Sequence, residues 1–224
     1  MPVGKRRKSV VNVNRREIYR YLGCGSKLPD AATQELVEDV LKELEARVTP
    51  RFIAREYALQ LDGDEIDFTC FKTTSRSLAK NLRGCEKVLL FAATLGEAPD
   101  FLCRRYARTA VSREVAVQAS AAAMIEAYCN ELNAVWKQEY AEKGFYLRPR
   151  FSPGYGDFPL SLQPLFLETL RAGRTIGITL TDSLLMMPTK SVTAVIGIGR
   201  EKTDCEPEGC EVCENSANCP YRRS

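Results

Sequence analysis

Six apolar residues follow one another in the stretch Lys87-Val88-Leu89-Leu90-Phe91-Ala92-Ala93-Thr94. Gly84 precedes this run and Gly96 follows it, so turn signals bound it on both sides. An apolar run of this length is typical of a strand buried on both faces, because a half-buried strand would alternate apolar and polar residues. We therefore predict a buried strand over residues 87–94.

Other β-rich segments lie before and after this strand, with helical patterns between them. The β-rich segments are 52–59, 66–70, 175–180 and 191–199. Helical patterns cover 14–22, 30–49, 74–82, 111–140 and 160–170, and one more starts near residue 100. Asn14 is expected to cap the first of these helices. Early and late strands separated by helices predict an α+β architecture around a mainly antiparallel sheet.

Composition limits the class of protein. The chain has 224 residues, 45% of them hydrophobic, which is enough for a sizeable core in one large domain with or without an appendage. A net charge of +3 does not require a nucleic acid partner. No apolar run reaches membrane-spanning length, and no signal-peptide core follows the basic start. We therefore expect a cytoplasmic protein without a membrane or nucleic acid partner.

The chain contains no histidine. This excludes Ser-His-Asp and Cys-His catalysis, histidine-ligated zinc and a histidine general base. Any chemistry must therefore use carboxylates, tyrosine, cysteine or the reactivity of a cofactor.

The composition changes at Thr203, where a short cysteine-rich tail begins. Cys205, Cys210, Cys213 and Cys219 have the spacing C-x4-C-x2-C-x5-C among polar residues that cannot form a core. In a reducing compartment such a cluster indicates metal rather than disulfides, and four thiolates suit either Zn²⁺ or an iron–sulfur cluster. A reduced tail without metal is the alternative. We predict a domain over 1–202 and a metal-binding tail over 203–224.

A candidate binding turn lies between Arg150 and Leu160. Pro153 fixes φ near −65°, and Gly154 supplies the positive φ that the third position of a type II turn needs. Arg150 and Tyr155 flank this turn, so a bidentate cation, free backbone donors and a phenol come together. These groups suit a small polar ligand that carries a carboxylate. The alternative is a loop closed by a surface arginine and a buried tyrosine.

Glu126 lies in the Ala-rich part of the long helical pattern over 111–140. A carboxylate in such an apolar segment needs a partner or a ligand, because burying it unpaired is costly. The alternative is that Glu126 lies on the solvated face of the helix.

Taken together, these segments resemble the activation (reactivation) domain of vitamin B12-dependent methionine synthase, in a stand-alone form. The specific motif is Arg150-Phe-Ser-Pro-Gly-Tyr155, followed by Gly-Asp-Phe-Pro159. Supporting segments are Tyr19-Arg-Tyr-Leu-Gly23, Thr94-Leu-Gly96, the helix with Glu126, and Met187-Pro-Thr-Lys-Ser191-Val-Thr-Ala. The resemblance implies an α+β fold, with a curved antiparallel sheet packed with long helices, that binds S-adenosylmethionine.

The resemblance also implies roles for individual residues. Arg150, Ser152, Pro153, Gly154 and Tyr155 would line the ligand site, with Arg150 on the methionyl carboxylate. Glu126 would meet the ammonium group. The family's acidic contact near the N-terminus has no assigned counterpart here. The four-cysteine tail is foreign to the fused enzymes of the family.

The implied activity is that of an accessory component of cobalamin-dependent methionine synthase, a methyltransferase. Oxidised cobalamin is rescued by one electron and a methyl group from S-adenosylmethionine, which requires no protein general base. The chain has neither a D-x-H-x-x-G corrinoid signature nor a G-x-G-x-x-G nucleotide loop after a strand. Cobalamin would therefore come on a methionine synthase that lacks its own activation domain. Electrons would come from a flavodoxin- or ferredoxin-like donor.

Two other functions fit the same residues. The protein could be a regulatory module that only senses S-adenosylmethionine and uses a zinc-bound tail to contact a partner. It could also be a redox protein whose tail holds an iron–sulfur cluster that feeds electrons to cobalt. The visible spectrum of protein purified without oxygen distinguishes zinc from an iron–sulfur cluster.

Overall fold

A computed structural model describes residues 3–4, 11–25 and 27–202 of the chain. Its centre is a sheet of five strands in the order β1-β2-β6-β10-β7, in which every pair of neighbours is antiparallel. The strands are β1 (Val3–Gly4), β2 (Arg51–Ala58), β6 (Cys85–Thr94), β7 (Tyr146–Leu147) and β10 (Ser191–Gly199). This confirms the predicted α+β class with a mainly antiparallel sheet, whereas the curvature of the sheet stays a prediction.

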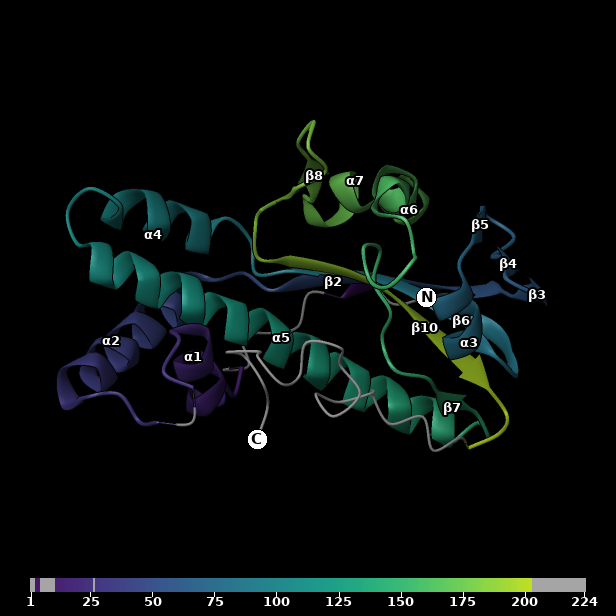
Figure 1. The fold of residues 1–224 in the computed structure, drawn as a ribbon, viewed down its shortest axis with the longest axis horizontal. Coiled ribbons are helices and arrows are strands. Elements are labelled where there is room, and N and C mark those ends of the chain that lie inside the picture. The colour runs from purple at the N-terminus through teal and green to yellow at the C-terminus, as the bar shows by residue number, and fades with distance from the viewer. Residues whose placement is uncertain (1–2, 5–10, 26, 203–224) are drawn as a thin grey trace.

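Helices cover both faces of this sheet (Figure 1). On one face lie α1 (Arg15–Tyr21), α2 (Ala31–Arg47) and the long α5 (Val111–Ala141), while α4 (Ala98–Tyr106) packs against α5. On the other lie α3 (Arg76–Leu82), α6 (Gln163–Leu170), preceded by the 3-10 turn η1 (Leu160–Leu162), and α7 (Ala172–Ile176). Two small sheets complete the fold: β3 (Gln60–Asp62), β4 (Glu65–Asp67) and β5 (Lys72–Thr74), and the hairpin of β8 (Thr179–Leu180) and β9 (Met186–Met187).

The predicted buried strand is the central β6, which pairs with β2 on one side and β10 on the other. Its side chains alternate between two cores: Leu89 and Phe91 pack toward α5, whereas Leu90 and Ala92 pack toward α6 and α7. Side chains of a strand alternate between its faces, so a strand covered on both sides must be apolar throughout. This explains why the run is unbroken.

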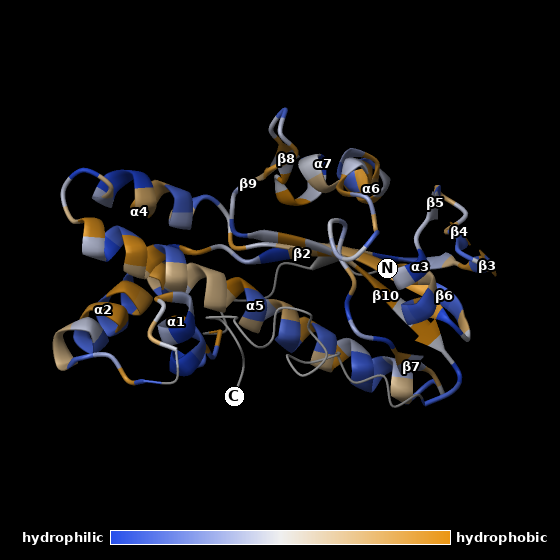
Figure 2. Cartoon of the chain, viewed as in Figure 1, coloured by the Kyte–Doolittle hydropathy of each residue, from blue (hydrophilic) through white to orange (hydrophobic). Residues whose placement is uncertain are grey.

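The helix α5 spans 31 residues, and its buried side chains include Ala121, Met124, Tyr128 and Trp136. Hydrophobic residues dominate its N-terminal half, and hydrophilic ones mix in toward its C-terminal end (Figure 2). No helix in the part of the chain that the structure describes is both long and apolar enough to cross a membrane.

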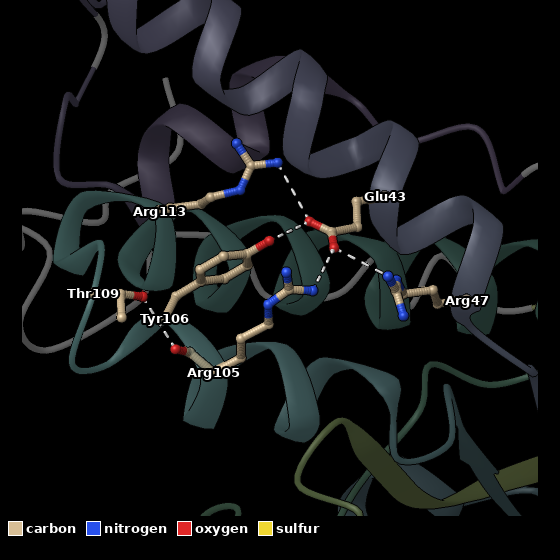
Figure 3. A network of polar contacts seen from close by, with 6 residues as sticks. All are labelled: Glu43, Arg47, Arg105, Tyr106, Thr109 and Arg113. Atoms are coloured by element: carbon tan, nitrogen blue, oxygen red, sulfur yellow. Dashed lines mark hydrogen bonds and ion pairs between the residues drawn. The ribbon is translucent and has the colours of Figure 1, made fainter.

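A polar network joins α2 to the α4–α5 corner through the carboxylate of Glu43 (Figure 3). Tyr106 Oη donates to it at 2.8 Å and Arg113 Nη2 at 3.3 Å, while Arg47 and Arg105 approach to 3.5 and 4.0 Å. Burial by itself raises the pKa of Glu43, but the hydrogen bonds from Tyr106 and Arg113 outweigh it, and the net shift is downward. Glu43 therefore stays charged and holds three helices in place.

Two of the β predictions need correction. Residues 175–180 were expected to be β-rich, but α7 extends to Ile176 and only Thr179–Leu180 form a strand. Ala172 and Ile176 are both buried and lie one helical turn apart, so packing overrides the β propensity of the β-branched residues in this segment. Gly177 ends the helix with φ 75°. In the segment 66–70, the strand ends at Asp67 because Thr69 adopts φ 65°.

Five cysteines lie outside the tail. Cys103 and Cys129 are buried, and burial raises their thiol pKa values to about 11 and about 12. Cys24, Cys70 and Cys85 are only half-buried. Cys103 and Cys129 are therefore small core residues.

Candidate functional site

A cavity of about 480 Å³ opens between α5, α6 and the β8–β9 hairpin, which we call the α5–α6 cavity. Five of the six residues predicted to bind ligand line it: Glu126, Arg150, Ser152, Pro153 and Tyr155. The sixth, Gly154, lies within the same turn. The fold thus brings a residue of the long helix next to a turn that follows it by more than twenty residues in the chain.

The turn has the backbone geometry that its sequence predicts. The amide of Tyr155 donates to the carbonyl of Ser152 at 3.0 Å, and Gly154 has φ 93°. A hydrogen bond across four residues with a positive φ at the third position is the signature of a type II turn. The type II turn is therefore confirmed, and its role in ligand binding stays a prediction.

The start of this turn is fixed to the central sheet. Phe151 forms an isolated antiparallel bridge with Val195 of β10, with N–O distances of 2.9 and 2.8 Å between the two residues. Arg150, the preceding residue, is thereby placed at the edge of the sheet and directed toward α5.

Arg150 and Glu126 contact each other, which the sequence alone did not predict. Arg150 Nη2 lies 3.1 Å from Glu126 Oε2 and donates to Asn130 Oδ1 at 2.8 Å. The arginine side chain is 20% exposed and the glutamate 42%, so both reach the cavity and solvent. A cation and an anion side by side match the carboxylate and ammonium of a free amino acid group.

A second part of the cavity lining is apolar. It consists of Leu160 and the hairpin residues Leu184, Leu185, Met186 and Met187. Leu160, Leu185 and Met187 are exposed, although large apolar side chains are usually buried. Tyr155 is also exposed, at 60%, so the alternative of a buried tyrosine is wrong. The mouth of the cavity therefore has an exposed apolar rim, which we define as Tyr155, Leu160, Leu185 and Met187.

The cavity has a buried polar floor that the sequence analysis missed. Gln163 Nε2 donates to Thr193 Oγ1 at 2.8 Å and lies 3.2 Å from Met186 Sδ. Gln163 and Thr193 are 2% and 3% exposed. A glutamine within an apolar helix and a threonine within an apolar strand were the signals available, because buried polar side chains need partners. That these two side chains, 30 residues apart, bond to each other could not be predicted from the sequence.

The four tail cysteines Cys205, Cys210, Cys213 and Cys219 lie outside the described residues, so their metal site stays a prediction. Within residues 3–4, 11–25 and 27–202, no group of three or more Cys, Asp or Glu side chains is arranged to hold a metal ion.

Comparisons with known proteins bear on the fold. A scan of protein-family models finds no match, and a search of curated proteins finds none. Among solved structures, the chain is similar to the crystal structure of the MetH reactivation domain bound to AdoHcy, with a TM-score of 0.60 and 19% identity. The similarity covers 84% of this chain and 76% of that chain. The chain therefore has the fold of that reactivation domain, as the sequence resemblance implied.

Proposed function

We propose that this protein binds S-adenosylmethionine in the α5–α6 cavity and supports the reductive methylation of the cobalamin of a partner methionine synthase. The observation that carries the proposal is the Arg150–Glu126 pair at a cavity that also has an apolar wall. The shared fold adds support, because the similar domain binds AdoHcy, which is what S-adenosylmethionine becomes when it loses its methyl group.

The parts of the ligand match the parts of the cavity. The methionyl carboxylate would pair with Arg150, and the ammonium would meet Glu126 and the amide oxygen of Asn130. The adenosyl group would lie against Leu160 and the hairpin residues Leu184–Met187, since ligand cavities combine an apolar lining with a few placed polar groups. Ser152, Pro153 and Gly154 would present the backbone of the turn to the ligand.

The reaction needs little from the protein beyond positioning. The acceptor cobalamin gains one electron before it accepts the methyl group. The bond between sulfur and the methyl carbon would then break with its electron pair staying on sulfur, a cobalt–carbon bond would form with the electron pair of the reduced cobalt, and AdoHcy would leave as a neutral thioether. No proton moves, which is compatible with a chain that contains no histidine. The protein supplies orientation and an apolar surrounding that favours the loss of the sulfonium charge.

The exposed apolar rim supports a role for a partner protein. Tyr155, Leu160, Leu185 and Met187 surround the opening through which the methyl group must be delivered. Exposed apolar side chains that gather at a concave site mark interaction surfaces. We propose that a cobalamin-binding methionine synthase without its own activation domain docks here, and that a flavodoxin- or ferredoxin-like protein supplies the electron.

A methyl-transfer assay tests the proposal. Protein, a partner loaded with oxidised cobalamin, a strong reductant and methyl-labelled S-adenosylmethionine should together yield labelled methylcobalamin. Leaving out the protein, the partner or the reductant should abolish the product. Binding of S-adenosylmethionine without any methyl transfer would instead favour the sensing module. Methylation of a small thiol or amine by the protein alone would favour an ordinary methyltransferase.

We also propose that the tail over 203–224 is a separate metal-binding unit that holds zinc or an iron–sulfur cluster. Protein purified without oxygen or chelators should contain about one metal centre per chain, as four thiolates in such a short polar segment require. Replacing Cys210 and Cys213 together by serine should remove the metal. Elemental analysis and the visible spectrum measure both results, and metal-free wild-type protein would contradict the proposal.

A further inference from the structure

The carboxylate of Asp157 links the binding turn to the first residues of α3. Asp157 Oδ1 accepts from Ser75 Oγ at 2.6 Å and from the amide of Ser77 at 3.0 Å, while Oδ2 accepts from the amide of Arg76 at 2.8 Å. Both oxygens are therefore in use, and the partners lie 80 to 82 residues away in the chain. Asp157 itself is exposed, so this cluster is not a consequence of core packing.

The helix that receives this link is well anchored. Leu78 and Leu82 of α3 are fully buried, and Ser75 is 2% exposed. Ser75 Oγ also accepts from the amide of Leu78 at 3.1 Å, so the hydroxyl that donates to Asp157 is itself held in place. The start of α3 is therefore held firmly enough to restrain a turn that is attached to it.

The link is close to the groups that would meet the ligand. Asp157 lies two residues after Tyr155, and the amide of Gly154 donates to the carbonyl of Phe158 at 2.8 Å. Gly156 has φ 52°, and a Cβ atom there would lie only 2.8 Å from Ser77 Oγ. The backbone of the turn thus approaches α3 more closely than a side chain at position 156 would allow.

The turn is consequently held from two sides. Phe151 connects its beginning to β10, and Asp157 connects its end to α3. The hydrogen bonds, led by that from Ser75, hold the pKa of Asp157 well below its usual range, so the carboxylate stays charged at any ordinary pH.

We propose that Asp157 is a positioning residue, which fixes the Ser152–Tyr155 turn against α3 so that the turn is already in its ligand-binding conformation before the ligand arrives. This inference rests on the proposed binding of S-adenosylmethionine at the turn. A ligand that must first order its binding turn has a weaker apparent affinity, in proportion to the fraction of protein already in the competent conformation.

The experiment compares Asp157→Ala and Asp157→Asn with the matched control Asp30→Ala. Asp30 also caps a helix, since its side chain accepts from the amide of Thr33 at 2.8 Å at the start of α2, but it does not line the cavity. Affinity for S-adenosylmethionine is measured by calorimetry. Hydrogen exchange over residues 150–158 reports the order of the turn without any ligand, and urea unfolding gives the stability of each variant.

We expect Asp157→Ala to weaken S-adenosylmethionine binding about tenfold. This is the loss that follows if the turn of the variant is in its ligand-binding conformation in about a tenth of the molecules. Exchange over 150–158 should be faster. Asp157→Asn, which keeps one acceptor oxygen, should be intermediate, whereas Asp30→Ala should bind like the wild type. Unchanged exchange over 150–158 in Asp157→Ala would overturn the inference, as would an equal loss of affinity in Asp30→Ala. If the wild type does not bind S-adenosylmethionine, the proposed function fails, and the exchange data still decide whether Asp157 fixes the turn.

Discussion

Replacing Arg150 with alanine is expected to weaken S-adenosylmethionine binding by about 2–4 kcal/mol, or roughly 30- to 700-fold. In the proposed complex the guanidinium would pair with the methionyl carboxylate, and its contacts with Glu126 and Asn130 already orient it. Without it, the carboxylate would enter the cavity beside Glu126, and like charges would repel. Calorimetry on the purified variant measures the loss.

The variant Arg150→Lys distinguishes the contribution of the positive charge to ligand affinity from that of the planar guanidinium. Arg150→Lys keeps the positive charge but loses the planar fork that binds a carboxylate with two hydrogen bonds, so its affinity should fall between those of wild type and Arg150→Ala. Arg15→Ala is the matched control, because Arg15 pairs with Glu38 through two hydrogen bonds of 2.8 and 2.9 Å away from the cavity. A folded Arg150→Ala protein with wild-type affinity would rule out the assigned role.

The second large effect concerns stability. Phe91→Ala should lower the free energy of unfolding by about 3–5 kcal/mol, the usual loss when a buried phenylalanine is truncated. Phe91 is fully buried in the central strand β6, and its neighbours across the sheet are Ala54 and Ala194. Its ring packs edge-on against Trp136 of α5, with 5.3 Å between the ring centroids. Neither of these two alanines is long enough to fill the resulting cavity.

Urea unfolding of Phe91→Ala and of Phe101→Ala provides the comparison. Phe101 lies on α4 and is 51% exposed, so its replacement should change the unfolding free energy by no more than about 0.5 kcal/mol. The slope of the unfolding free energy against urea should stay the same if both variants unfold in two states. A loss below about 1 kcal/mol at Phe91 would mean that the contact between α5 and the sheet does not depend on this ring.

Local features were predictable where the residue types in a short segment strongly favour one backbone conformation. Asn14 was expected to cap a helix, and its side chain accepts from the amide of Arg16 at the start of α1. Pro153 followed by Gly154 predicted a type II turn, and Gly154 has the required positive φ. The unbroken apolar run around Phe91 predicted the buried strand that became the centre of the sheet. In each case the physical cause lies within a few residues of the chain.

The sequence alone therefore determined the α+β class, the buried strand over 87–94, most of the longer helices, and the residue types available to a ligand at Arg150–Tyr155. The tertiary structure decided which side chains meet. Glu126 and Arg150 pair across 24 residues, Gln163 and Thr193 across 30, and Asp157 reaches Ser75 across 82. Tertiary packing also made residues 172–176 a helix, because a helix allows Ala172 and Ile176 to be buried on the same side. A hydrogen bond between distant segments depends on how helices and sheet pack, and periodicity along the chain does not carry that information.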